Sequence, residues 1–232
     1  MTGSPSINRI LIVSCVSLVS SSLHALEKSS KPPFRGHETF DVLKPEHFTK
    51  FPEKNSRVRE GVLWTHGKSG NKYPPSVGIP IAEKDCTLSF KYRHLGDGGM
   101  IWFFINGEDG FGSFDHLLRV KLTRAGVAVQ VDGHSKDANH PKRQADRKPD
   151  KVSGAYRLPE KLPLDKVNLT ENKWHQVKLV FIKNKVTISL DDNLWTKQLS
   201  RPGFVYEKQE LYWMLNGGDQ GIEIDDVKVV AN

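Results

Sequence analysis

Residues 117 to 132 read LLRVKLTRAGVAVQVD, and this stretch decides the fold. Apolar and polar side chains alternate on either side of residues 123 to 126, a pattern typical of two strands that are joined by a turn and buried on one face. Closing the turn pairs apolar residues on one face: Leu122 with Val127, Val120 with Val129, and Leu118 with Val131. On the other face Arg119 lies opposite Gln130, so the stretch predicts an antiparallel hairpin.

A second stretch has the same pattern. Across the turn Lys183-Asn184, Val177, Leu179 and Phe181 pair with Leu190, Ile188 and Val186. Further strands are predicted between turn residues at 57–65, 86–93, 100–106, 211–216 and 222–230. No helical period of useful length follows residue 26, so we expect an all-β sandwich of two antiparallel sheets.

Length and charge set broad limits. The 232 residues suit one sandwich-sized domain plus an export segment. Lys and Arg number 34 and Asp and Glu 27, and the resulting net charge of +7 is mild for this size, so it does not indicate nucleic-acid binding. Beyond the N-terminus no run of apolar residues is long enough for a transmembrane segment. The sequence indicates no particular oligomeric state.

Residues 1–25 have the pattern of a secretory signal peptide. Arg9 supplies the positive charge, and residues 10–19 are largely apolar. A segment rich in small residues follows and ends at Ala25, after which we expect cleavage. The alternative is a lipidation box that ends at Cys15, but the apolar run before it is too short. We therefore expect export to the periplasm or the outside of the cell, without a lipid anchor.

The mature chain divides into a polar linker over residues 26–36 and one domain over residues 37–232. A long polar insertion occupies residues 133–164, and its length indicates a functional or a mobile loop. Its basic pairs, Lys142-Arg143 and Arg147-Lys148, could contact an acidic polysaccharide.

Cysteine and histidine patterns indicate neither a disulfide nor a metal. Cleavage would remove Cys15 and leave Cys86, which we expect to be a small core residue of a strand. The CxxC and HExxH motifs are absent from the sequence. The polar loop carries His134, Asp137, Asn139 and His140, whose spacing fits no calcium or zinc loop. We expect no cofactor, and a structural calcium ion is left open.

Four stretches match strand motifs of one known family. Residues 57–63 (RVREGVL) resemble W-x-V-x-D-G-V-L, and residues 172–179 (NKWHQVKL) resemble G-x-W-H-x-V-x-V. Residues 188–192 (ISLDD) resemble V-x-V-D-G, and residues 224–229 (IDDVKV) resemble I-x-x-V-x-V. The second and fourth motifs are shared by many concanavalin-A-like sandwiches, so they indicate the fold more than the function.

Two further stretches are more particular: residues 116–120 (HLLRV) resemble G-H-L-x-R-V, and residues 139–143 (NHPKR) resemble a recurring loop. Together the six stretches resemble the 3-keto-disaccharide hydrolase domain family, which is abundant in exported proteins of planctomycete-like bacteria. The resemblance spans roughly residues 38–232, with Arg57 in place of the opening Trp and Asp192 in place of the hairpin Gly. It implies a concanavalin-A-like jelly roll, often with a concave sheet that faces carbohydrate.

Two kinds of glycoside-cleaving chemistry can be considered. A conventional glycosidase needs two carboxyl groups across a cleft; the E-x-D-x-E pattern of related sandwich glucanases is absent, and Glu223, Asp225 and Asp226 come closest. A 3-keto sugar has an acidified neighbouring C–H bond, so one general base and a cation beside the enolate could suffice.

The first hairpin offers such groups on its polar face. We hypothesise that Asp132 or His116 is the base and that Arg119 stabilises the enolate oxygen. The alternative is a solvated sheet face with ordinary cross-strand polar pairs. Aromatic faces can also stack on sugar rings, and the predicted substrate-binding residues are Trp102, Asn106, Lys121, Gln130 and Trp213.

The sequence thus predicts an exported, carbohydrate-directed domain that binds or cleaves a glycoside, and the resemblance implies a 3-keto-glycoside. The alternative is a non-catalytic module that binds carbohydrate or protein at the cell surface.

Overall fold

The computed structural model describes residues 31–67, 74–96, 99–108, 110–111, 114–145, 147–151, 153–216, 218 and 220–232, with only the backbone of residues 114 and 115. The predicted signal peptide, including Cys15, lies outside the described residues.

Strands dominate the described chain, and they form two sheets. One sheet has eight strands: β1 (Gly36–Glu38), β2 (Ser56–Arg59), β3 (Val62–Thr65), β5 (Cys86–His94), β10 (His175–Ile182), β11 (Lys185–Leu190), β12 (Trp195–Ser200) and β14 (Ile222–Ala231). The other has six: β4 (Ser76–Glu83), β6 (Met100–Glu108), β7 (Phe114–Thr123), β8 (Gly126–Ser135), β9 (Tyr156–Lys161) and β13 (Lys208–Asn216). Three short 3-10 helices complete the elements: η1 (Pro45–His47), η2 (Asp191–Asn193) and η3 (Pro202–Val205).

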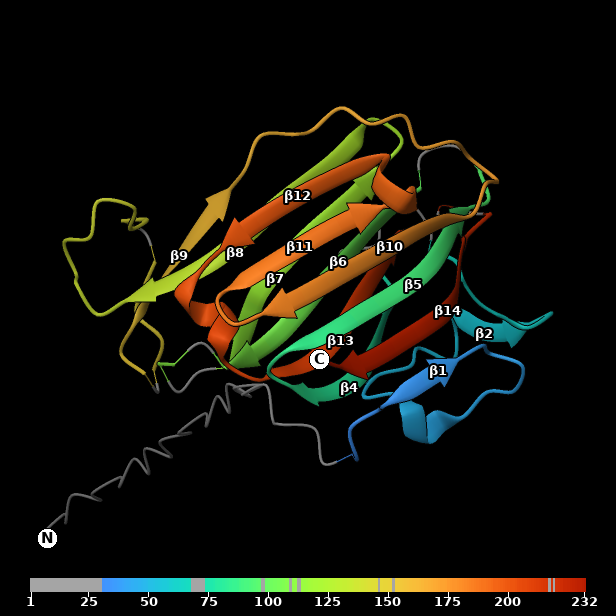
Figure 1. Cartoon of the computed structure of the whole chain (residues 1–232), viewed down its shortest axis with the longest axis horizontal. Coiled ribbons are helices and arrows are strands. Elements are labelled where there is room, and N and C mark those ends of the chain that lie inside the picture. The colour runs from blue at the N-terminus through green and yellow to red at the C-terminus, as the bar shows by residue number, and fades with distance from the viewer. Residues whose placement is uncertain are drawn as a thin grey trace, which may run out of the picture.

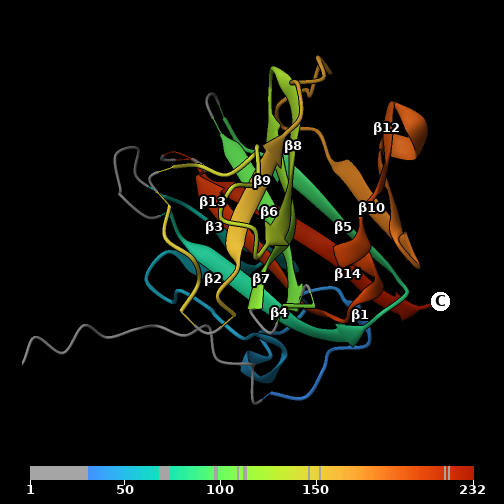
Figure 2. The ribbon, with the colours of Figure 1, turned by 90° about the vertical axis from the view of Figure 1, so that its left-hand side faces the viewer.

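The two sheets stack face to face. The eight-stranded sheet has the order β12-β11-β10-β5-β14-β3-β2 with β1 beside β14, and the six-stranded sheet has the order β4-β13-β6-β7-β8-β9. Figure 1 shows the first sheet in front of the second, and Figure 2 shows the two layers from the side. Every strand pair is antiparallel, which confirms the predicted all-β sandwich.

Both predicted hairpins have the predicted registers. Arg119 lies opposite Gln130 in the β7–β8 hairpin, and each of its three predicted apolar pairs is formed. In the β10–β11 hairpin Leu179 lies opposite Ile188, with the other two pairs also as predicted. Alternation and turn position were sufficient because a slip of one residue would expose every apolar side chain of a strand.

Three predicted boundaries are wrong. Residues 57–65 do not form one strand, because Glu60 and Gly61 both have positive φ (50° and 73°) and make a tight turn between β2 and β3. The linker ends before residue 36, since Phe34 is buried in the core. The loop predicted at 133–164 is shorter, because β8 continues to Ser135 and β9 begins at Tyr156.

The core lies between the sheets and is rich in aromatic rings. Phe90 of β5 meets the rings of Phe103 and Trp213 from the six-stranded sheet edge-on, each at 5.3 Å between centroids. Cys86 is a buried core residue, as predicted. Its burial raises the pKa of the thiol to about 12.

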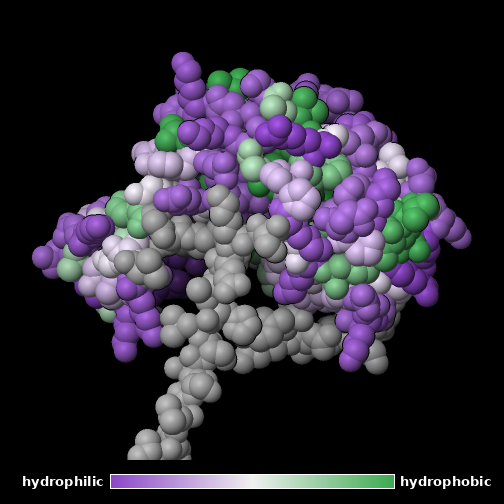
Figure 3. All heavy atoms as spheres, turned by 90° about the horizontal axis from the view of Figure 1, so that it is seen from below, coloured by the Kyte–Doolittle hydropathy of each residue, from purple (hydrophilic) through white to green (hydrophobic). Residues whose placement is uncertain are grey.

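The surface seen from below in Figure 3 is mostly hydrophilic, with small hydrophobic spots. Within the described chain, no helix has the length and apolar character needed to cross a bilayer.

Candidate functional site

The candidate site is the outer face of the six-stranded sheet, the side turned away from the eight-stranded sheet. On β6 the side chains of Ile101, Phe103 and Ile105 enter the core, so those of Trp102, Phe104 and Asn106 point outward. Their neighbours on the adjacent strands bring the predicted residues to the same face. Trp102 lies opposite Lys121, Phe104 opposite Arg119, and Arg119 opposite Gln130.

A register shift between β6 and β7 brings His116 to this face. In a regular strand, residues three apart point to opposite faces, so His116 and Arg119 would be separated by the sheet. The register shifts at Asn106, which lies opposite His116, and Leu117 is the extra residue of β7. As a result the His116 ring lies 4.7 Å from that of Phe104, and the Arg119 guanidinium lies 5.8 Å from the same ring.

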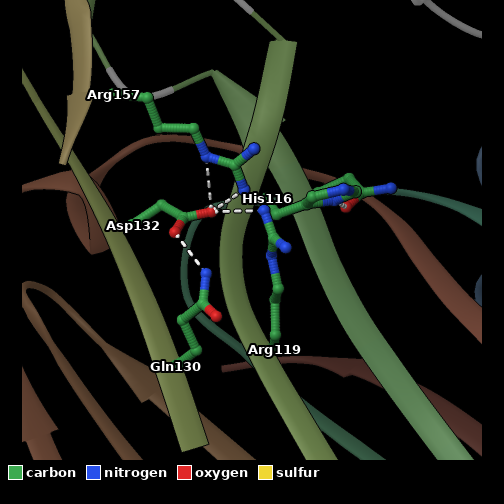
Figure 4. Close-up of polar contacts among 6 residues, drawn as sticks. His116, Arg119, Gln130, Asp132 and Arg157 are labelled. Atoms are coloured by element: carbon green, nitrogen blue, oxygen red, sulfur yellow. Dashed lines mark hydrogen bonds and ion pairs between the residues drawn. The ribbon is translucent and has the colours of Figure 1, made fainter. Parts of the chain in front are cut away.

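Asp132 of β8 lies at the centre of a buried polar cluster. Its carboxylate side chain is 1% exposed. One oxygen accepts hydrogen bonds from Arg119 Nη2 (2.9 Å), from Arg157 Nε (3.0 Å) and from Arg157 Nη2, and the other accepts one from Gln130 Nε2 (3.0 Å). Figure 4 shows the three side chains converging on Asp132.

This cluster changes the role that fits Asp132 best. A carboxylate that accepts hydrogen bonds from two guanidinium groups is strongly favoured in its ionised form. It is therefore suited to hold Arg119 and Arg157 in place, and it is poorly suited to take a proton from a substrate. Of the two bases that the sequence offered, His116 fits the geometry better.

His116 belongs to a second hydrogen-bonded chain on the same face. Its Nδ1 lies 2.6 Å from Asn106 Oδ1, and Asn106 Nδ2 donates to Glu210 Oε2 at 2.7 Å. Thr49 Oγ1 donates to the other oxygen of Glu210. Because the Asn106 NH₂ group donates to Glu210, the amide oxygen of Asn106 faces His116 and can only accept from it. His116 then carries its hydrogen on Nδ1, and Nε2 is the basic nitrogen of the neutral ring.

Aromatic rings line the face between and beside these two polar groups. Trp102 stacks on Phe104 at 6.1 Å between ring centroids, and Tyr212 meets Phe104 edge-on at 5.6 Å. Lysine side chains extend over two of the rings, Lys121 over Trp102 (5.5 Å) and Lys50 over Tyr212 (5.8 Å). Phe104 itself is 5% exposed, so the apolar surface of the face comes from the partly exposed rings of Trp102 and Tyr212, next to the polar side chains.

The prediction that Trp213 binds substrate is wrong. Trp213 is 0% exposed and belongs to the core, because residues alternate along β13 and Tyr212 points outward instead. The remaining predicted residues, His116, Arg119, Asp132, Trp102, Asn106, Lys121 and Gln130, share the outer face.

Sequence reasoning missed four residues of the face: Arg157, Glu210, Tyr212 and Thr49. Arg157 was assigned to the polar loop, whereas it lies on β9 opposite His134. The alternation of side chains along β13 could have identified Tyr212. Its neighbours Leu211 and Trp213 are both buried, so Tyr212 points to the other face. The Thr49–Glu210 hydrogen bond joins residues 161 positions apart, so no local sequence pattern predicts it.

The acidic residues of the last strand lie elsewhere. Glu223 of β14 is on the eight-stranded sheet, where it binds Arg59 Nη2 (3.2 Å) and Arg93 Nε. Asp226 binds Lys91 and His37, and these hydrogen bonds hold its carboxyl pKa at about 2. Within the described residues, no group of three or more His, Cys, Asp or Glu side chains could hold a metal ion.

Comparisons with known proteins support the fold. Neither the family models nor the curated proteins include a match, so the family resemblance stays a prediction. Among solved structures, a glycoside hydrolase family 16 endo-glucanase from Bacteroides ovatus is similar, with a TM-score of 0.54 and 13% identity over 84% of this chain and 99% of that one. LamA from Zobellia galactanivorans, in complex with laminaritriose and laminaritetraose, has a TM-score of 0.51 and 12% identity over 87% and 100%.

A xylan beta-1,4-xylosidase from Bacillus halodurans C-125 is also similar, with a TM-score of 0.55 and 10% identity. The match covers 86% of this chain but 40% of the xylosidase. At these identities the similarity concerns the fold alone. It confirms the predicted jelly roll of two antiparallel sheets.

Proposed function

We propose that the protein is an exported, carbohydrate-directed domain that binds a glycoside on the outer face of its six-stranded sheet and cleaves it where the sugar carries a 3-keto group. The observation that carries this proposal is the shared face of His116, Arg119 and the Trp102–Phe104 rings. Aromatic faces can cover the apolar side of a pyranose ring. The glycan-acting enzymes among the similar structures support the ligand class.

The proposed cleavage needs one base and one cation. His116 Nε2 takes the hydrogen from the carbon between the keto group and the glycosidic carbon, and the electron pair passes to the keto oxygen. Arg119 stabilises the resulting enolate by charge and hydrogen bonding. The enolate then expels the glycosidic oxygen, which receives the proton from His116, and a double bond remains in the sugar ring.

Each polar neighbour has a positioning role in this scheme. Asp132 and Gln130 hold Arg119 through the buried cluster, and Asn106 with Glu210 fixes the His116 tautomer. Such fixed orientation matters because a misplaced base or cation loses much of its effect on the transition state.

Turnover of a 3-keto-glucoside tests the proposal, with the unmodified glucoside as the reference substrate. We expect release of the aglycone from the keto sugar only, and a loss of about 100-fold or more in kcat/KM for His116→Gln. Lys178→Gln, an exposed position on β10 of the other sheet, should retain full activity. If no keto-glycoside is turned over while Trp102 contributes to glycan binding, the domain is a binding module, and the catalytic part of the proposal fails.

Export has its own test. We expect the exported protein to begin at Leu26, as N-terminal sequencing of the secreted chain would show. Recovery of the intact chain with Met1 from the cytoplasm would contradict this part of the proposal.

A further inference from the structure

We propose that the outer face contains an anion pocket next to Arg119, and that this pocket takes the acidic group of a charged glycan, either the carboxylate of a uronic acid or a sulfate ester. This inference rests on the proposed function in one respect, that the ligand is a carbohydrate, and it specifies the class of carbohydrate.

The pocket lies at the β8–β9 end of the face. It has a volume of about 170 Å³ and is lined by Arg119, Gln130, Gln144, Arg147, Arg157, Pro159 and Lys161. A water molecule occupies roughly 30 Å³ of liquid, so the pocket can hold one acidic group and part of its sugar ring. It is too small for an oligosaccharide, which would have to extend along the face.

Positive charge dominates the described lining of this pocket. Four of its described lining side chains are cationic. Asp132, a carboxylate next to the pocket among the described residues, is buried and already shared by Arg119 and Arg157. Arg147 and Lys161 differ from these two, because neither makes an ion pair with any described residue. Guanidinium groups match the planar geometry of carboxylate and sulfate oxygens. A neutral sugar would not need this concentration of charge.

The pocket continues the aromatic part of the face in a single row. Tyr212 lies opposite Phe104, Phe104 opposite Arg119, Arg119 opposite Gln130, and Gln130 opposite Lys161. The row therefore crosses five adjacent strands of the six-stranded sheet, roughly 19 Å at about 4.8 Å per strand. A short glycan lying along this row would stack on the partly exposed ring of Tyr212 at one end and present its acidic group to the pocket at the other.

Arg119 links the pocket to the proposed chemistry. Its guanidinium lines the pocket, binds Asp132 and lies over the Phe104 ring beside His116. An acidic group in the pocket would thus fix the sugar next to the base. For this reason the test uses Arg147 and Lys161, which line the pocket but lie outside the proposed catalytic groups.

The experiment compares three ligands of equal length by calorimetry: trigalacturonate, a sulfated galactan trisaccharide and neutral galactotriose. We expect at least one acidic ligand to bind about tenfold or more tightly than the neutral one, and the better acidic ligand identifies the acidic group. Raising NaCl from about 50 to about 300 mM should weaken acidic binding and leave neutral binding unchanged.

The double variant Arg147→Gln/Lys161→Gln should lose about tenfold in affinity for the acidic ligand and keep its affinity for galactotriose. Lys178→Gln/Lys185→Gln removes the same charge from exposed positions on β10 and β11, and it should retain the preference. If the neutral ligand binds as tightly as both acidic ones, or if the pocket variant keeps the preference, the anion pocket is wrong and the proposed function stands. If none of the three ligands binds, the anion-pocket proposal is also wrong. The proposed function is then tested separately by the turnover of a keto-glycoside.

Discussion

Replacing His94 with Gln should remove a large part of the acid sensitivity of the fold. His94, at the end of β5, is 4% exposed, and its ring lies 5.5 Å from Tyr92 in an edge-on contact. Burial, and to a smaller extent the nearby His175, lowers the pKa of His94 from 6.5 to about 4. Between these two pKa values His94 is therefore neutral in the native state, whereas the same side chain is protonated in the unfolded chain.

The size of the effect follows from the two pKa values. Above pH 6.5 His94 is neutral in both the folded and the unfolded state, so its protonation takes nothing from the free energy of unfolding. As the pH falls from 6.5 to 4, the unfolded state takes up a proton that the folded state does not, and the free energy of unfolding decreases. Since one pKa unit corresponds to about 1.4 kcal/mol, the shift of 2.5 units costs about 3 kcal/mol at pH 4.

Urea unfolding at a series of pH values from 7.5 to 4 measures this loss. Carboxylates such as Asp226 titrate in the wild type and the variant alike, so the difference between their two pH profiles isolates His94. His140→Gln, in the β8–β9 loop, controls for the removal of one histidine. Parallel profiles for wild type and His94→Gln would refute the reasoning, as would an NMR titration of the His94 ring with a midpoint near 6.5.

Three further predictions concern the core and the buried cluster. Trp213→Ala should lower the free energy of unfolding by about 3–5 kcal/mol in urea melts, whereas a loss under 1 kcal/mol would contradict its burial. Asp132→Ala should cost about 3 kcal/mol because Arg119 and Arg157 lose their buried partner; an unchanged melting curve would show that the cluster is not formed. In a Cys15→Ser background, the Cys86 thiol should react with Ellman's reagent only after unfolding, and rapid reaction of the native protein would contradict its position in the core.

The local part of the fold was predictable because alternation, turns and register are properties of neighbouring residues. Both hairpins follow from pairs such as Leu122 with Val127, where a shift by one residue would expose the buried face. The β2–β3 turn was missed although Gly61 was visible, because Val58 between two arginines and the apolar run after Gly61 were both typical of a strand and were joined into one. Asp192 adopts a positive φ of 48°, so it takes the backbone conformation that favours the Gly of the resembled motif.

The candidate site was predictable only where it lies on the first hairpin. Arg119, Gln130 and Asp132 follow from one alternating pattern. His116 joins them through the shift at Leu117, and a regular strand would have placed it on the opposite face. Glu210 and Arg157 reach the site through strand pairings distant in sequence, which a single sequence does not encode as a local pattern.

The indole N–H resonances of Trp102, Trp64, Trp174, Trp195 and Trp213 provide the most direct test of where this protein meets its ligand. Trp102 lies on the candidate face, Trp64 and Trp174 lie on the eight-stranded side, and Trp213 lies in the core. During an NMR titration with the best-binding oligosaccharide, with each resonance assigned by a Trp→Phe variant, we expect the Trp102 signal to shift and those of Trp64 and Trp174 to stay. Movement of Trp64 or Trp174 with Trp102 unchanged would contradict the proposed binding face.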